Sequence, residues 1–322
     1  MSTASSPRVL RRVVDWLPTD VDRRVRVFAW LSFVAEVLII GTGGAVRLTG
    51  SGLGCPTWPR CTPDSLVNTP EMGIHGIIEF GNRTLTGVVG ILALAVVVLM
   101  WRMRRERRGM FVLALVVLGG IVAQAVVGGI TVLTGLNPFI VGFHYIASVV
   151  LVTVCAAFLT LMYLPIGPRE RAVPAWFAGL VHLTTGVLAL TVVFGVLTTG
   201  AGPHSGDAAA VERNGFDAEV LEHVHAWPGY ALFALTLVLV VLAWRLRLPV
   251  RRWATALLAV ELVQIAVGLY QARNGLPELA VGVHMVLAAL TAATMTVVVL
   301  RLKTSVPPTR ANEDDAVAAA RR

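Results

Sequence analysis

Long apolar stretches separated by short polar segments make up most of the chain. Eight of these stretches reach about 20 residues, the length that a helix needs to cross a bilayer. We expect the spans at residues 27–46, 74–100, 110–133, 139–163, 174–198, 221–243, 253–273 and 279–300. Because residues 1–26 contain no long apolar core, no cleavable signal peptide is visible, and the first span is expected to remain in the membrane. Residues 301–322 form a polar segment, expected to be a solvated tail.

The composition indicates an all-α integral membrane protein. The chain of 322 residues is 56% hydrophobic and only 14% charged, whereas an ordinary globular domain carries about 25% charged residues. Its mean hydropathy is +0.75. These values exclude a soluble enzyme, a disordered chain and a disulfide-rich scaffold.

The net charge of +8 would suit a nucleic-acid-binding protein, but the positions of the basic residues argue against one. Of the 27 Lys and Arg residues, 22 lie in segment 1–26, in the loops after spans two, four and six, and in the tail. By the positive-inside rule, both termini are cytoplasmic and the other four loops face outward across the cell membrane. The charge therefore reflects membrane orientation and gives no indication of nucleic acid as a partner.

The cysteines fit this orientation. Cys55 and Cys61 lie in the first outer loop, in the sequence Cys55-Pro-Thr-Trp-Pro-Arg-Cys61, on the oxidising side where a disulfide can persist. Two free thiols or two weak metal ligands are the alternatives, although no His or further Cys lies nearby to complete a zinc site. Cys155, inside the fourth span, is expected to be an ordinary packed thiol.

The two halves of the chain repeat the same pattern of polar and glycine residues. At a shift of 140, Gln124, Gly128, Gly135, Leu136 and His144 correspond to Gln264, Gly268, Gly275, Leu276 and His284. Glu79-x-x-Asn82 corresponds to Glu222-x-x-His225 at a shift of 143. Since each half has four spans, both insert with the same orientation. We expect two four-helix bundles, 27–163 and 174–300, related by a pseudo-two-fold axis along the membrane normal.

Three histidines are candidate haem ligands. His144, His225 and His284 each lie about five residues inside the outer end of a span, at a shared depth of roughly 7 Å. Ionisable groups inside a bilayer are costly and tend to be functional. His225 and His284 could place imidazoles on opposite faces of an iron porphyrin. The alternative is a set of interhelical hydrogen bonds. His204 and His223 are expected at the rim, and His182 is expected to be a packing residue.

Among the acidic residues inside the spans, Glu79 has the most informative neighbours. It precedes Asn82 by three residues and Arg83 by four, so the three lie on one face or adjoining faces of a helix. The pair Glu79 and Arg83 suits a structural ion pair. It suits equally a site in which Arg83 binds a porphyrin propionate and Glu79 handles a proton. Glu36 and Glu261 have no such neighbours and are not expected at a site.

These residues resemble a known family, the haem A synthases. The resemblance rests on the loop Gly43-Gly44-Ala45-Val46-Arg47-Leu48-Thr49-Gly50-Ser51-Gly52-Leu53-Gly54-Cys55-Pro56 with Trp58-Pro59-x-Cys61. Glu79-x-x-x-Arg83, the Gln-x-x-x-Gly pairs and Thr199-Gly200-Ala201-Gly202-Pro203-His204 are similar too. The resemblance covers about residues 27–300.

The resemblance implies an enzyme that oxidises the C8 methyl of haem O to the formyl of haem A, for terminal oxidases. It implies a haem b held by His225 and His284 in the second bundle. Substrate haem would lie in the first bundle with His144 as a ligand. Cys55 and Cys61 match the family's outer-loop cysteines, and Glu79 matches the glutamate proposed to assist the oxidation.

One position departs from the family. The family histidine between that glutamate and arginine is Asn82 here, and an amide is a poor iron ligand. His75 is seven residues earlier on the same helix face, about 10 Å away along the axis. We expect His144 to hold the substrate haem, with His75 as the candidate second ligand.

Two other functions share part of this pattern. A di-haem b-type cytochrome would use the same histidines for electron transfer but has no need of the glycine-cysteine loop. A haem carrier or transporter would bind haem in the first bundle without a redox partner in the second. For the synthase, the expected partners are an electron donor of unknown identity and membrane lipid, and the haem O-producing synthase and oxidase assembly factors are further candidates.

Overall fold

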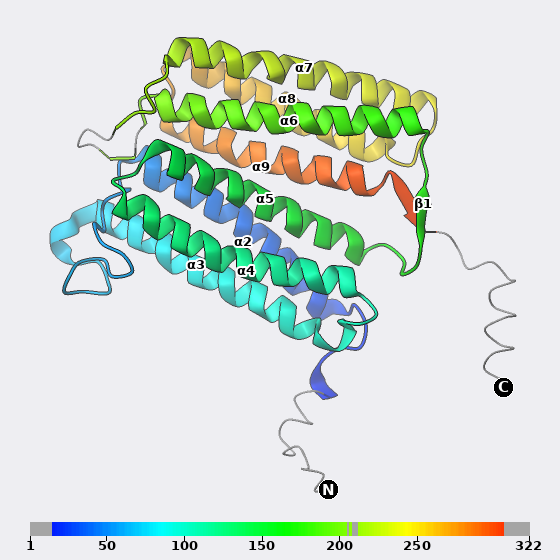
Figure 1. The fold of residues 1–322 in the computed structure, drawn as a ribbon, viewed down its shortest axis with the longest axis horizontal. Coiled ribbons are helices and arrows are strands. Elements are labelled where there is room, and N and C mark those ends of the chain that lie inside the picture. The colour runs from blue at the N-terminus through cyan, green and yellow to red at the C-terminus, as the bar shows by residue number, and fades with distance from the viewer. Residues whose placement is uncertain (1–14, 205, 208–211, 306–322) are drawn as a thin grey trace, which may run out of the picture.

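Eight long helices form nearly all of the regular structure in the part of the chain that the computed structural model describes, residues 15–204, 206–207 and 212–305 (Figure 1). The helices are α2 (Arg23–Leu48), α3 (Gly73–Leu99), α4 (Arg108–Leu133), α5 (Pro138–Met162), α6 (Ala175–Ala201), α7 (Ala218–Arg245), α8 (Arg251–Arg273) and α9 (Glu278–Leu300). Each one is long and apolar enough to cross a membrane. The eight predicted spans are therefore confirmed, with ends that differ by four residues or fewer.

Four shorter elements complete the described structure. Two 3₁₀ turns, η1 (Pro70–Met72) and η2 (Trp101–Met103), flank α3. Two strands, β1 (Arg169–Arg171) and β2 (Lys303–Ser305), form an antiparallel ribbon. The sequence did not predict this ribbon, because three-residue strands from distant segments carry no periodic signal.

Local sequence explains where several helices begin and how they are joined. The Asp22 carboxylate accepts a hydrogen bond from the Val25 amide at the start of α2, and Asn137 caps α5 just before Pro138. The turns that precede α5 and α9 repeat one backbone conformation. Gly135-Leu136 has φ of 61° at both residues, and Gly275-Leu276 has 71° and 58°. A residue with a side chain rarely adopts this conformation, so its recurrence at matched positions agrees with the sequence repeat.

Helices from the two halves of the chain lie on opposite sides of the molecule, α2–α5 on one side and α6–α9 on the other (Figure 1). Where the sides meet, α5 packs against α9, α2 against α9 and α5 against α6. The Tyr145 hydroxyl donates a hydrogen bond of 2.8 Å to the Met285 carbonyl across this junction. The pseudo-two-fold axis and the division into bundles at 27–163 and 174–300 stay predictions.

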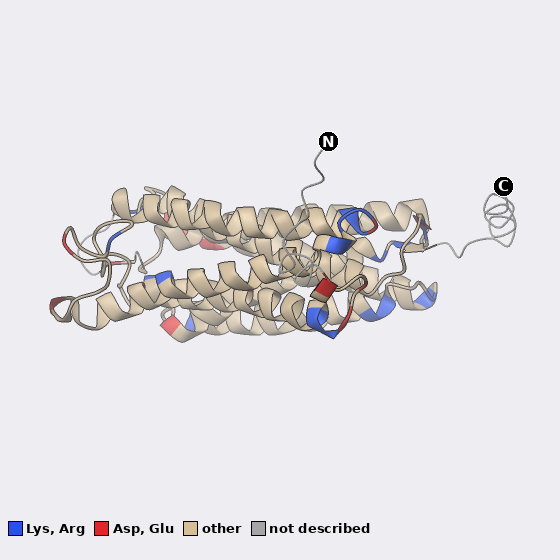
Figure 2. Ribbon diagram, turned by 90° about the horizontal axis from the view of Figure 1, so that it is seen from below, with Lys and Arg blue, Asp and Glu red and all other residues tan. Residues whose placement is uncertain are grey.

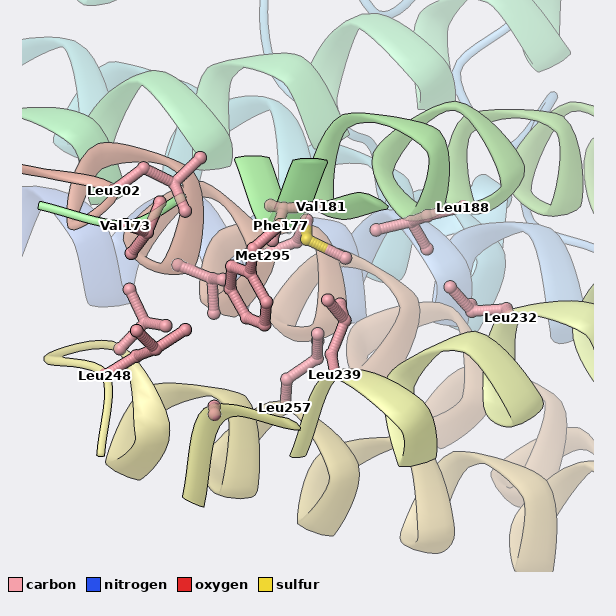
Figure 3. Close-up of a cluster of buried hydrophobic side chains, with 13 residues drawn as sticks. Val173, Phe177, Val181, Leu188, Leu232, Leu239, Leu248, Leu257, Met295 and Leu302 are labelled. Atoms are coloured by element: carbon pink, nitrogen blue, oxygen red, sulfur yellow. The ribbon is translucent and has the colours of Figure 1, made fainter. Parts of the chain in front are cut away.

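The side chains divide between a packed interior and an apolar outer surface. Phe177, Val181, Leu239 and Leu257 are fully buried in one cluster between α6, α7, α8 and α9 (Figure 3). Large apolar side chains also point outward, as Ile91 does at 68% exposure. Figure 2 shows the helices largely free of charge along their middle, with Lys and Arg gathered mainly toward one end. The protein is therefore a multi-pass integral membrane protein, since only lipid can cover so much apolar surface. The cytoplasmic placement of its termini stays a prediction.

Candidate haem-binding sites

The loop between α2 and α3 packs against α3 and α4. Cys55 and Cys61 form a disulfide within it, which confirms that prediction and excludes both free thiols and metal ligation by the pair. The Trp58 ring lies on α4 at Gly129, where a Cβ atom would overlap the indole. The loop backbone also passes directly over the start of α3, because a Cβ at Gly54 would overlap the His75 carbonyl. Glycine is therefore required at both contacts. Elsewhere, Cys155 is a buried free thiol, as expected.

Glu79 and Arg83 hold this loop to α3. Arg83 Nη2 lies 2.5 Å from Glu79 Oε1, and the Cys55 amide donates to Glu79 Oε2 at 2.5 Å. The same guanidinium donates to the carbonyls of Cys55 and Thr57, both at 2.9 Å, and to that of Arg60 at 3.2 Å. Both side chains are largely buried, at 6% exposure for Glu79 and 19% for Arg83. The ion pair therefore joins the disulfide loop to the helix, and its donors point at loop carbonyls.

His75 lies at the surface of the same region. Its side chain is exposed, and its Nδ1 lies 2.9 Å from Ser51 Oγ, which in turn lies 2.8 Å from Thr49 Oγ1. Ser51 is fully buried, so the imidazole fastens the first turn of α3 to the glycine-rich loop. In this arrangement His75 faces the loop.

His144 lies on α5 in a different environment. The side-chain amide of Gln124 on α4 donates to the His144 carbonyl at 2.8 Å. Gly128 leaves room beside the ring, since a Cβ there would lie 3.5 Å from Cε1. The imidazole Nδ1 is buried and has no hydrogen-bond partner among the described residues. Because buried ring nitrogens are rarely left without a partner, this atom is suited to a ligand that the chain itself does not supply.

Asn82 turns toward α2. Its Oδ1 accepts a hydrogen bond of 2.8 Å from the Thr42 hydroxyl, and its Nδ2 lies 3.9 Å from the position that a Cβ at Gly43 would take. The Asn82 side-chain amide therefore joins α3 to α2. An Asn side chain adds no good iron ligand here.

His225 and His284 meet in the second group of helices, on α7 and α9. Their ring centres lie 6.2 Å apart, and their ring planes cross at 80°. His225 Nδ1 lies 3.0 Å from the Thr191 carbonyl, so that nitrogen carries the proton and Nε2 keeps its lone pair. Glycines leave space for both rings: a Cβ at Gly195 would lie 2.8 Å from Cε1 of His225, and one at Gly268 would lie 3.0 Å from Cε1 of His284.

This pair fits the axial ligands of one haem. An imidazole nitrogen lies about 2 Å from its metal, so two rings on opposite faces of one metal have centres roughly 6 Å apart. His284 Nδ1 is buried without a hydrogen-bond partner in the described part of the chain. A carbonyl that orients a ligating imidazole, as Thr191 does for His225, is usual at metal sites. The residues present therefore fit a bis-histidine haem.

The loop after α2 and the loop after α6 are joined by hydrogen bonds, a feature that the sequence did not predict. Arg47 at the end of α2 donates to the carbonyls of Thr199 and His204, both at 2.8 Å. His204 Nε2 lies 2.9 Å from the Leu276 carbonyl, and the Gly52 amide donates to the Gly206 carbonyl at 2.7 Å. Arg47 had no assigned role, and its isolation from the other basic residues was the signal that could have identified it.

The remaining polar residues lie away from these sites. His223 is exposed and bonded to the backbone of its own helix. Glu36 and Glu261 are buried, and Glu261 accepts a hydrogen bond of 2.8 Å from Thr236. His182, expected to be a packing residue, is instead exposed on α6 and lines a cavity at the opposite end of the molecule.

Comparisons with known proteins give one consistent family. The sequence profile COX15-CtaA, described as cytochrome oxidase assembly protein, matches residues 26–204. A heme A synthase of Listeria monocytogenes is 26% identical over 277 residues, covering 82% of this chain and 88% of that protein. A heme A synthase of Lysinibacillus sphaericus is 35% identical over 132 residues, or 40% of this chain and 42% of that protein.

Proposed function

Because the chain belongs to the COX15-CtaA family of cytochrome oxidase assembly proteins, the haem A synthase family, we propose that it oxidises the C8 methyl of haem O to the formyl of haem A. The observation that carries the proposal is an asymmetry between the two halves. His225 and His284 form a close pair. In the first half, His144 has a buried ring nitrogen without a hydrogen-bond partner among the described residues, and Asn82 occupies the position at which the second half has a histidine. Two ligands suit a resident cofactor, and one suits a substrate that must leave as product.

The second half would hold the cofactor, haem b. His225 and His284 would hold it, with Thr191 orienting His225 and with Gly195 and Gly268 leaving room for the rings. Haem b bound there would supply electron transfer or oxidant activation for the reaction. The surrounding apolar helices would keep water from the ring edges.

The first half would hold the substrate haem through His144. Gln124 bonds the His144 backbone and lies 2.5 Å from the Ser148 hydroxyl, so α4 and α5 are fixed to each other at the ligand. His75 remains the candidate second ligand. Because its Nδ1 is hydrogen-bonded to Ser51, Nε2 would be the nitrogen that ligates. The His75→Ala variant tests this: unchanged haem spectra and activity would remove His75 from the site.

Glu79 would act on protons during the oxidation. Two successive hydroxylations of the methyl carbon, each a two-electron oxidation that needs an oxidant and an oxygen atom from outside the chain, would give a geminal diol, which would lose water to form the aldehyde. A carboxylate beside that carbon can accept a hydroxyl proton as the carbonyl forms. Arg83 would position Glu79, because its donors are engaged by the carboxylate and by loop carbonyls. Binding of a propionate by Arg83 would require some of those bonds to open.

The proposed setting follows from the same features. The termini would be cytoplasmic, and the haem sites would lie near the outer face. An electron donor would be required, and the haem O-producing synthase and oxidase assembly factors are candidate partners. The product would serve haem A-containing terminal oxidases.

Chromatography of extracted haems tests the proposal. In a host that makes haem O but no haem A, expression of the chain should produce haem A. His144→Ala should abolish the product, whereas His223→Ala, at an exposed histidine away from the proposed sites, should retain it. Absence of haem A despite a folded, haem-loaded protein would overturn the proposed synthase activity and would favour the function of a di-haem cytochrome.

A further inference from the structure

A basic cavity lies at the end of the molecule opposite the disulfide loop. It has a volume of about 600 Å³ and lies between the start of α6, the end of α9 and the β1–β2 ribbon. Three cationic side chains line it, Arg169, Arg171 and Lys303. Among the described residues, no Asp or Glu lines it. The proposed haem chemistry uses none of these residues.

The ribbon directs its positive charges to one face. Arg171 pairs directly with Lys303 in the antiparallel register, so the two side chains emerge side by side. Arg169 is two residues from Arg171 and shares that face, whereas Glu170 points to the other one. Like charges directly opposite each other destabilise a strand pair. An anion bound between Arg171 and Lys303 would attract both side chains, so their pairing would become stabilising.

Arg169 is also cationic, so it does not neutralise Arg171 and Lys303. Its guanidinium donates to the carbonyls of Leu300 and Lys303, and its buried Nε has no partner in the described part of the chain. Burial, together with the nearby charge of Arg301, lowers the pKa of Arg169. Arg171 and Lys303 are exposed, and neither forms an ion pair with any described residue. The cavity therefore presents charge available to a ligand.

The other wall of the cavity is formed mainly by small side chains of α6. Ala175, Ala178, Gly179 and His182 lie on one face of α6, at helical spacings of three and four residues. The opposite face carries Phe177 and Val181 into the core (Figure 3). Small side chains on the outer face leave a groove. Trp176 beside it is 55% exposed, as is usual for a residue at the level of lipid headgroups.

We propose that this cavity binds an anionic phospholipid, with Arg171 and Lys303 contacting the phosphate and the small-residue face of α6 receiving the glycerol and first acyl carbons. Basic pockets between membrane helices on the cytoplasmic side are suited to such headgroups. The convergence of the charges from one strand pair suits a single phosphate. A porphyrin would need separate contacts for its two carboxylates.

Titration of short-chain lipid into the purified, delipidated full chain tests the assignment. The probe is dioctanoyl phosphatidylglycerol, with dioctanoyl phosphatidylcholine, inorganic phosphate and haemin as comparators. Two variants address the two walls: Arg171→Gln with Lys303→Gln removes the charges, and Gly179→Leu fills the groove. A Cβ at Gly179 meets no described atom within 4 Å, so the new side chain starts in open space and not against the packed core. Arg105→Gln with Arg252→Gln is the matched charge control, at exposed positions outside the cavity.

Phosphatidylglycerol should bind more tightly than phosphatidylcholine or inorganic phosphate. The double charge variant should lose about thirtyfold in affinity, since each surface cation contributes about fivefold to binding an anionic lipid. Gly179→Leu should weaken binding without any change of charge, and the control pair should bind as the wild type does. Equal affinity of wild type and both cavity variants would overturn the proposal, as would tighter binding of haemin at this cavity.

Discussion

Gly195 provides the sharpest test of the proposed haem b site. In Gly195→Ala, the new methyl group would lie 2.8 Å from His225 Cε1 and 3.1 Å from its Nδ1. Carbon atoms in favourable contact lie about 3.5–4.0 Å apart, so the imidazole must move by roughly 0.7 Å. The substitution changes no ligand and no charge. It acts only through the position of the ring.

The size of the effect follows from what holds His225. Its Nδ1 hydrogen bond to Thr191 measures 3.0 Å, and a displacement away from α6 would lengthen it to about 3.7 Å, beyond bonding distance. Loss of a partner that orients a ligating histidine costs about 10–100-fold in metal affinity. The helix itself gains up to about 1 kcal/mol from replacing Gly with Ala, so the protein should remain folded.

Haem retention measures this directly. Wild type, Gly195→Ala and Gly186→Ala would be purified from one host, their haem b content determined, and haem loss to an acceptor protein followed. Gly186 lies on the same helix, and a Cβ there meets no described atom within 4 Å, so Gly186→Ala gains the same helix propensity without touching His225. Gly195→Ala should lose haem at least tenfold faster than the control. Equal haem content and equal retention in the two variants would refute the assignment of His225.

Three further outcomes are expected at the end of the molecule that carries the disulfide loop. Arg83→Gln leaves the Glu79 carboxylate buried without its cation and should lower stability by about 3 kcal/mol, measured by thermal unfolding. Arg60→Gln, at an exposed side chain, serves as the control, and equal melting temperatures of the two variants would contradict the role of the Glu79–Arg83 pair in holding the loop to α3. Cys61→Ser should cost about 2 kcal/mol of loop stability and speed hydrogen exchange in residues 51–61, whereas unchanged exchange would show that the loop is held without the disulfide. Asn82→His should give substrate haem the spectrum of a six-coordinate, low-spin iron. An unchanged spectrum would show that residue 82 does not reach the iron.

Most of the fold could be predicted from the sequence because the bilayer imposes a simple rule. A span must satisfy its backbone internally and present apolar side chains to lipid, so helix number and approximate ends follow from hydropathy alone. The Gly135-Leu136 and Gly275-Leu276 turns show that the repeat extends to backbone conformation. The β1–β2 ribbon was missed because its two strands are far apart in sequence and too short to show a pattern.

The sequence by itself determined the eight helices, the cysteine pair and the identity of the candidate ligands, because these depend on residue type and local spacing. Only the tertiary structure decided which of them meet. In the folded protein the ring centres of His225 and His284 lie 6.2 Å apart. His75 faces Ser51, and the Arg83 guanidinium donates to loop carbonyls. The tertiary structure also joined the two halves through Arg47 and gathered Arg171 and Lys303 at one cavity. Hydropathy places a residue at a depth in the membrane, but packing of helices about their axes determines which side chains face one another.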